Sequence, residues 1–144
     1  MVPGAKPLQE YANLYVCARN PMMYVRSSQH LDLCVLRIST PALNLPGVVI
    51  ADGNAASGWT AFEPSPSGLG RIDKETVFAE RWTDPNPVTY WENKRVKCAE
   101  VLVPDRLDPK FIFGAYVSCQ EAADKLGQIA PGLEITIDAH LFFR

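Results

Sequence analysis

The sequence predicts an α+β domain built from curved, mostly antiparallel sheets with few, short helices. Short apolar runs rich in β-branched residues alternate with turn residues along the chain, which is typical of strands. Twelve prolines and nine glycines interrupt the sequence, and they leave little room for long helices. The helical segments are few and do not alternate regularly with the strands, so a parallel sheet built from βαβ units is not expected.

The length and composition indicate an ordinary globular domain. The chain has 144 residues, which is enough for one core, and no apolar run approaches the ~20 residues of a membrane span. Its formal net charge of −2 means that a nucleic acid would have to bind a local basic patch. The widely spaced cysteines and the two histidines do not form a metal-ligand pattern, so no metal is expected. Reduced thiols and the lack of an apolar signal segment favour a cytoplasmic protein.

The strands are predicted from runs of β-branched and aromatic residues bounded by turn residues. In chain order they are Ala12–Ala18, Leu33–Ile38, Val48–Ala51, Val96–Val103 and Phe111–Val117, followed by one or two edge strands in Glu134–Asp138 and His140–Phe143.

Short helical segments are predicted from caps and prolines. Ser118 and Glu121 have the spacing of a capping box, so a helix is expected over Cys119–Leu126, ending at Gly127. Pro21 can open a helical turn after Asn20. The other expected segments are Pro7–Tyr11 as a turn or a brief helix, a turn beginning at Ser39–Pro41, a helix in Asp73–Glu80, and Val88–Arg95 as a short helix or an ordered loop.

Glu100 is out of place in the apolar run Val96–Val103. Because strand side chains alternate between faces, Lys97 and Val101 would share one face and Glu100 and Leu102 the other. The face with Lys97 could contact water, so the face with Glu100 is the better candidate for the interior. A buried carboxylate is costly unless it is paired, and such a group is often kept for chemistry at a cleft. An edge strand with Glu100 in solvent is the alternative.

Basic and aromatic residues gather just before this strand. Arginine and lysine bind phosphates, and aromatic rings stack on bases, so the mixture suits single-stranded nucleic acid. The alternative is an amphipathic segment whose rings pack in the core. The residues are Arg81, Trp82, Tyr90, Trp91, Lys94, Arg95 and Lys97.

Two further positions are candidates for ligand contact. Arg19 leaves the end of an apolar strand, a common place for a side chain that meets a ligand, although it could equally be a surface arginine. The small-residue loop Asp52–Trp59 can line a site because its backbone can approach a ligand closely, or it can be a simple connection.

Four pieces of the chain together resemble the DarT family. These pieces are Leu8–Tyr24, Val48–Ala56, Cys98–Pro104 and Leu141–Arg144, and they occur in the family's order over nearly the whole sequence. DarT proteins are toxins of toxin–antitoxin systems that transfer ADP-ribose to bases of single-stranded DNA. The resemblance implies the ADP-ribosyltransferase fold, a split pair of mostly antiparallel sheets with NAD in the cleft between them. Residues 1–144 would form one such domain.

The resemblance also implies roles for individual residues. Glu100 would be the catalytic glutamate, which stabilises an oxocarbenium-like ribose. NAD would be the co-substrate, and no metal would be needed. The residues that would border NAD are Tyr15, Arg19, Asn20 and Met22. Those that would read DNA are Asn54, Arg81, Trp82, Tyr90, Trp91, Lys94 and Arg95. A macrodomain antitoxin is the partner protein that the family implies. DarT proteins also bind NAD through an N-terminal segment with a His-x-Thr-like motif. No counterpart of this motif is found before Leu8.

Two other functions stay open at this point. A catalytically inactive DarT-like module could bind single-stranded nucleic acid or an antitoxin without using NAD. A glycosidase would need two carboxylates, and Asp52 is the obvious second acid beside Glu100.

Overall fold

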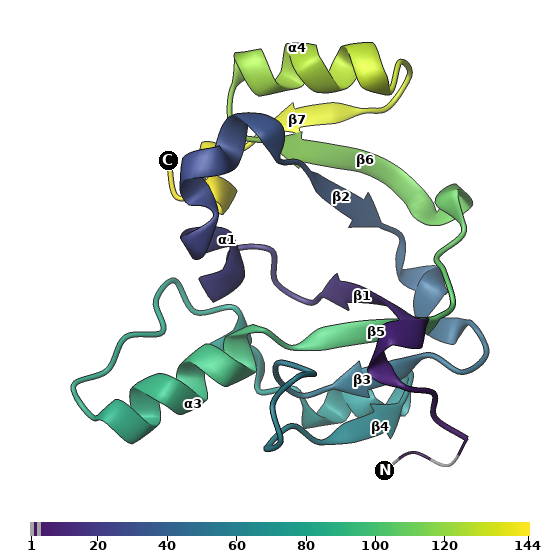
Figure 1. Cartoon of the computed structure of the whole chain (residues 1–144), viewed down its shortest axis with the longest axis vertical. Helices are drawn as coiled ribbons and strands as arrows, with labels where there is room; N and C mark the ends of the chain where they lie inside the picture. Colours follow the sequence, from purple (N-terminus) through teal and green to yellow (C-terminus); the bar gives the residue numbers. More distant parts are fainter. Residues whose placement is uncertain (1, 3) are drawn as a thin grey trace. The chain divides into compact units, whose positions relative to one another are not determined.

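The strands form two sheets, as the sequence predicts. The computed structural model describes residue 2 and residues 4–144, and in that part of the chain seven strands and four α-helices are present (Figure 1). The chain divides into two compact units, one for each sheet. The first unit is Met1–Cys17 with Leu43–Leu107, and the second is Ala18–Ala42 with Asp108–Arg144.

The sheet of the first unit is antiparallel throughout. Its strand order is β1 (Tyr11–Tyr15), β5 (Glu100–Pro104), β3 (Val49–Ala51) and β4 (Phe62–Pro64). β5 pairs with β1 on one side and with β3 on the other. Glu100 therefore lies on an interior strand, and the alternative of a solvated edge strand is wrong.

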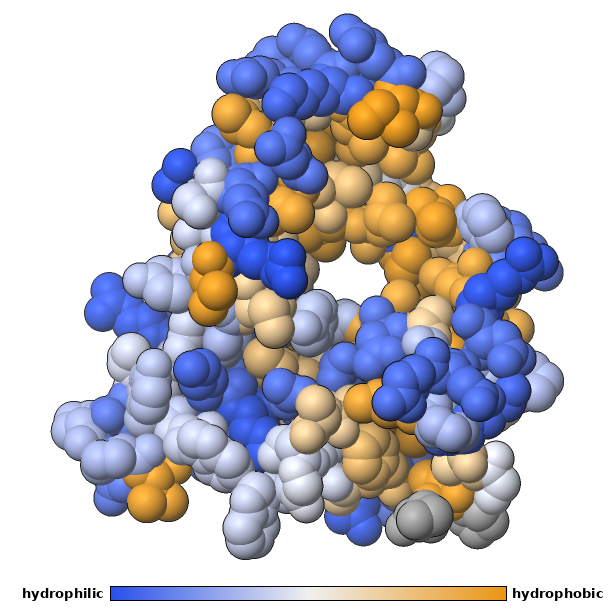
Figure 2. Space-filling view, viewed as in Figure 1, coloured by the Kyte–Doolittle hydropathy of each residue, from blue (hydrophilic) through white to orange (hydrophobic). Residues whose placement is uncertain are grey.

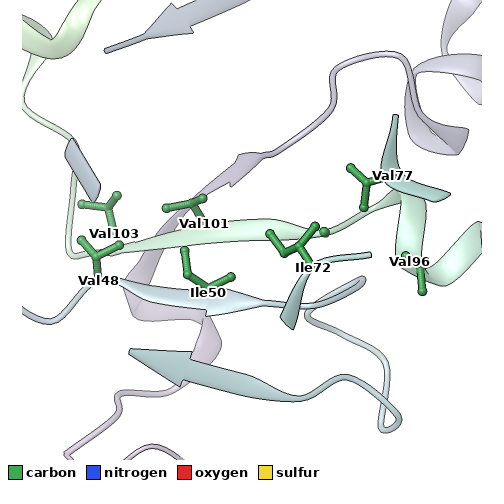
Figure 3. Close-up of a cluster of buried hydrophobic side chains, with 8 residues drawn as sticks. Val48, Ile50, Ile72, Val77, Val96, Val101 and Val103 are labelled. Carbon is green, nitrogen blue, oxygen red and sulfur yellow. The ribbon is translucent and has the colours of Figure 1, made fainter. Parts of the chain in front are cut away.

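Both faces of β5 are buried. Val101 and Val103 point into a core that helices α2 (Lys74–Val77) and α3 (Pro87–Lys97) help to close (Figure 3). Leu102 points to the opposite face, into a second apolar cluster. The first core consists of Val48, Ile50, Ile72, Val77, Val96, Ala99, Val101 and Val103.

The strand at Glu100 begins four residues later than predicted. Asn86 caps α3 by accepting hydrogen bonds from two N–H groups of its first turn, and a proline at the first helical position suits the start of a helix. The helix then continues through Val96 and Lys97. Lys97 is only 1% exposed, and its ammonium group donates a 2.8 Å hydrogen bond to the carbonyl of Val77. The prediction that Lys97 faces water from a strand is therefore wrong.

The sheet of the second unit has the order β2 (Val35–Ile38), β6 (Ile112–Val117) and β7 (Ile135–Ile137). β2 and β6 are antiparallel, whereas β6 and β7 are parallel because helix α4 (Gln120–Ile129) carries the chain across between them. The surface over α4 is mostly hydrophilic (Figure 2). The two sheets are thus mostly antiparallel, which confirms the predicted fold class.

Three predictions for the second unit are wrong. α4 begins at Gln120 and passes through Gly127, so this glycine does not end the helix. Ser118 makes no cap; its hydroxyl lies 2.6 Å from Nδ1 of His30 instead. The predicted strand His140–Phe143 is a 3₁₀ turn, Ala139–Phe142.

The remaining helical segments are short. α1 (Pro21–Val25) begins at the predicted proline. The other 3₁₀ turns are Leu8–Glu10, Ser27–Asp32, Thr40–Asn44, Ser67–Arg71 and Pro109–Phe111. Across the described residues, no helix combines the length and the apolar character needed to cross a bilayer.

Candidate active site

Glu100 is buried at the first position of β5, with 7% of its surface exposed. Both carboxylate oxygens are held. Oε1 accepts a 3.0 Å hydrogen bond from Nδ2 of Asn13, and Oε2 accepts a 2.6 Å hydrogen bond from the main-chain N–H of Ala55. Because a carboxylate accepts only, two N–H donors complement it and fix its orientation.

The strands on either side determine what lies next to this carboxylate. Tyr15 of β1 and Ala51 of β3 are the cross-strand partners of Glu100, and partners in an antiparallel pair point to the same face. Ala51 is small and fully buried, whereas the side chain of Tyr15 is 45% exposed. Tyr15 is therefore the accessible aromatic group beside the carboxylate.

An apolar hollow of about 180 Å³ lies on the same face of the first sheet. Leu102, two residues after Glu100, and Ala55, which binds Glu100 through its backbone, both contribute to the wall. This side of the sheet is therefore largely apolar near the carboxylate, and a less polar environment strengthens electrostatic interactions. The wall consists of Val2, Ala5, Lys6, Leu8, Tyr11, Val49, Ala55, Phe62 and Leu102.

The loop that supplies Ala55 is fixed to the last turn of α3. Nη1 of Arg95 donates to Oδ1 of Asp52 at 3.2 Å and to Oγ1 of Thr60 at 3.0 Å. The N–H of Asn54 donates to the carbonyl of Arg95 at 2.9 Å. The loop approaches Arg95 closely at Gly53, since a Cβ there would collide with the guanidinium and lie 3.1 Å from the Arg95 carbonyl oxygen, so a side chain at this position would displace Arg95.

Arg95 also forms a bidentate pair with Glu92, through Nη2 at 2.6 Å and Nε at 3.0 Å. This pairing lowers the pKa of Glu92 and raises the pKa of Arg95. The side chain of Arg95 is only 9% exposed. Its guanidinium is engaged by protein carboxylates, which favours a structural role over the predicted DNA contact. Asp52, the second acid of the glycosidase alternative, is likewise bound to Arg95.

The other members of the basic and aromatic segment divide into two groups. Trp82 is buried at 9% exposure, so its ring packs in the interior. Tyr90 and Trp91 are 36% and 47% exposed, and Lys94, with its ammonium 6.0 Å from the Tyr90 ring centroid, is exposed beside them. Arg81 is also exposed. These four side chains remain available for the predicted contact with DNA.

The predicted NAD contacts fall in different units. Tyr15 is in the first unit with Glu100, whereas Arg19, Asn20 and Met22 are in the second. Asn20 is buried, and its side chain accepts the N–H of Met23 at 2.9 Å to cap α1. Their contact with NAD stays a prediction.

Arg19 is held by the C-terminal turn of the second unit. Its Nε donates to the carbonyl of His140 at 3.0 Å, and its guanidinium lies 4.1 Å from the centroid of the Phe143 ring. Met22 is 41% exposed on α1. Within the described residues, no group of three His, Cys, Asp or Glu side chains could hold a metal ion.

Sequence reasoning missed the two groups that hold Glu100. Asn13 could have been found, because it is a polar residue in an apolar strand and shares the face of Tyr15. Ala55 could not, because it contributes a backbone N–H that any residue other than proline would supply.

Solved structures with the same fold indicate the class of protein. The chain matches Thermosipho africanus DarTG in complex with ADP-ribose with a TM-score of 0.82 and 29% identity, over 99% of this chain and 38% of that one. It matches Thermus sp. 2.9 DarT in complex with carba-NAD⁺ with a TM-score of 0.84 and 23% identity, over 98% of this chain and 77% of that one. The architecture is therefore that of the ADP-ribosyltransferase class.

The family follows from the sequence match. Residues 1–143 match the family described as ssDNA thymidine ADP-ribosyltransferase, DarT, and the chain belongs to that family. A DNA ADP-ribosyl transferase–DNA ADP-ribosyl glycohydrolase fusion protein of Thermosipho africanus (strain H17ap60334) is 31% identical over 147 residues, covering 96% of this chain. The chain spans only 36% of the length of that relative. The predicted resemblance to DarT is confirmed.

Proposed function

We propose that this chain transfers ADP-ribose from NAD to a thymidine base of single-stranded DNA, with Glu100 as the catalytic carboxylate. The observation that carries the proposal is the buried carboxylate whose two oxygens are held by Asn13 and Ala55. The family match runs through both units, so we take residues 1–144 as one functional domain.

The reaction requires stabilisation of a positive charge on a sugar. The bond between the nicotinamide nitrogen and the ribose carbon breaks, and its electron pair leaves with nicotinamide. An electron pair of the base then forms the new bond to the ribose, and the base loses a proton. A carboxylate that is already oriented stabilises the oxocarbenium-like ribose without reorganising. The same carboxylate can orient a ribose hydroxyl or take the proton of the base.

The substrates would contact accessible groups in each unit. In the first unit, Tyr15 is the cross-strand partner of Glu100 and is our proposed NAD contact. In the second unit, Arg19 and Met22 are the proposed NAD contacts, and Asn20 would support them from its cap on α1. The DNA strand would follow the exposed cations and rings, since these bind phosphates and stack on bases. These residues are Arg81, Tyr90, Trp91 and Lys94, with Asn54 in the loop that holds Glu100 and with Trp82 and Arg95 supporting them from the interior.

The setting proposed for this activity is a cytoplasmic toxin–antitoxin pair. DNA and NAD are both available there, and the Thermosipho africanus relative joins its transferase to a DNA ADP-ribosyl glycohydrolase. A glycohydrolase of the macrodomain type that removes the modification is therefore the proposed partner.

Transfer from labelled NAD to an oligonucleotide tests the proposal. A thymidine-containing single strand should be labelled, and a strand without thymidine should not. Glu100→Gln keeps the size of the side chain but removes its charge, and it should lower labelling by about 10²- to 10⁴-fold. Glu75→Gln, which changes an exposed glutamate of α2, should label like the parent protein.

Two results would contradict the proposal in different ways. Full labelling by Glu100→Gln would remove Glu100 from the mechanism. An unsubstituted chain that binds the oligonucleotide but neither binds nor consumes NAD would support the inactive binding module instead.

A further inference from the structure

Trp59 presents a large aromatic surface to solvent. Its side chain is 77% exposed, although it lies only four residues after Ala55, the residue whose N–H holds Glu100. Burial of a tryptophan is normally favourable, so an indole left this open is a candidate contact surface. The loop Asp52–Thr60 thus binds the candidate catalytic carboxylate at one position and exposes an indole at another.

Hydrogen bonds make this loop rigid. Oγ1 of Thr60 donates to the carbonyl of Asn54 at 2.6 Å, and the N–H of Ser57 donates to the same carbonyl at 2.9 Å. The N–H of Ala61 donates to Oδ1 of Asp52 at 2.9 Å, which closes the loop. Because the backbone is already fixed, a ligand that stacks on the indole does not have to order the loop first.

The charges of the loop do not oppose a polyanion. Asp52 is the only charged residue between positions 51 and 61, and it is paired with Arg95. The loop is fixed to the end of α3, whose accessible side chains include Trp91 and Lys94. The surface over α3 is mostly pale to blue, with a single small orange group (Figure 2). No unpaired carboxylate of the loop would repel a phosphate.

The residues next to the indole argue against a protein partner. Ala56, Ser57, Gly58 and Thr60 are small or polar, so Trp59 is isolated in its own loop. Protein docking needs a contiguous apolar patch of a few hundred square ångströms. A nucleic acid base needs a single accessible ring.

We propose that Trp59 is a base-stacking platform for the single-stranded DNA substrate. A base of the strand stacks on the indole while the exposed cations of the same unit bind its phosphates. The loop that orients Glu100 would therefore also hold the DNA beside it. This inference rests on the proposed function, because it assigns a contact to the same substrate.

Binding of a fluorescent single-stranded oligonucleotide, followed by anisotropy at several salt concentrations, tests the platform. Stacking contributes enough per base that Trp59→Ala should raise the Kd roughly 5- to 150-fold. Trp59→Phe keeps a ring and should restore most of the affinity. The loss should be similar for different base sequences, because every base has a face that can stack. The slope of log K against log salt should not change, since indole carries no charge.

Two controls separate stacking from other effects. Ile129→Ala removes a side chain that is 80% exposed in the second unit, and it should bind DNA normally. Lys94→Gln should reduce the salt slope by about 0.7, the signature of one lost phosphate contact on a single strand.

The outcomes are distinguishable. Normal affinity in Trp59→Ala, or no recovery in Trp59→Phe, would overturn the stacking platform while leaving the transferase proposal intact. If the unsubstituted protein does not bind single-stranded DNA, the proposed function and the platform are both wrong.

Discussion

Arg95 and Asp52 form an ion pair, 3.2 Å between Nη1 and Oδ1, that joins the last turn of α3 to the loop after β3. The same loop places the N–H of Ala55 on Glu100 at 2.6 Å. The side chain of Arg95 is nearly buried, so it is poorly placed to meet a phosphate. We infer that Arg95 is a positioning residue, which acts on Glu100 through the loop.

Loss of Arg95 should therefore lower turnover more than DNA binding. In Arg95→Gln the loop is released at both Asp52 and Thr60, and a shift of about 1 Å in a catalytic group can cost ~10²-fold in rate. We expect kcat for DNA labelling to fall by up to that amount. The KM for DNA and the salt slope of binding should stay close to those of the parent protein. Arg95→Lys retains one charge and should recover part of kcat.

Lys94 provides the matched comparison one residue away. It is exposed, so Lys94→Gln should raise the KM for DNA and reduce the salt slope. A reduced salt slope in Arg95→Gln, equal to that of Lys94→Gln, would show that Arg95 binds a phosphate and that the positioning role is wrong.

Asn13 should be a second positioning residue for Glu100. Its amide satisfies an oxygen of a buried carboxylate, so replacing it should also lower the free energy of unfolding by about 1–3 kcal/mol. Asn13→Ala loses the 3.0 Å hydrogen bond to Oε1 and should lower kcat roughly 2- to 10-fold. Asn13→Asp places a second carboxylate at that position, and repulsion should lower kcat further. If both variants have the kcat of the parent protein at saturating NAD and DNA, Asn13 does not position Glu100.

The sequence predicts the fold well where local pattern and tertiary burial agree. Runs such as Val49–Ala51 and Ile112–Val117 are apolar, bounded by turn residues, and form strands. The prediction fails at Val96. The β-branched residues in this run suggest a strand, but the helix capped by Asn86 continues to Lys97. β4 has the sequence Phe-Glu-Pro, which lacks β-branched residues and ends in a proline, so its pattern does not indicate a strand.

The site was predictable only in part. Glu100 stands out because an acidic residue interrupts an apolar run. The group that holds it cannot be recognised in the same way, because Ala55 acts through its backbone N–H. The pairing of Arg95 with Asp52 joins residues 43 positions apart, and nothing in the local sequence indicates it. The basic and aromatic segment suggested one role for all its members, but the fold buries Trp82 and leaves Trp91 exposed.

Lys97 should matter for stability. Its four-carbon stem is buried, and its ammonium donates to the carbonyl of Val77, tying α2 to the end of α3. Lys97→Ala leaves a cavity and removes that donor, so we expect the free energy of unfolding in urea to fall by about 2–4 kcal/mol. Lys94→Ala, at an exposed position of the same helix, should change it by less than ~0.5 kcal/mol. Equal effects of the two variants would contradict the structural role of Lys97.

The pair between Glu92 and Arg95 should make stability depend on pH in the acid range. The pKa of Glu92 is lowered from 4.5, chiefly by its hydrogen bonds to Arg95. A carboxyl group whose folded pKa lies below its unfolded pKa adds stability above the unfolded value and loses it as the pH falls through the folded value. The parent protein should therefore be more stable than Glu92→Gln at neutral pH, and the difference should vanish on acidification below pH 4.5. The side chain of Glu92 is 47% exposed, so solvent screening should keep the difference under ~1 kcal/mol.

Urea unfolding of both proteins from neutral pH to below pH 4.5 measures this difference in the free energy of unfolding, with Glu75→Gln as the control for an exposed glutamate. A difference that persists unchanged in acid would mean that the charge of Glu92 does not contribute.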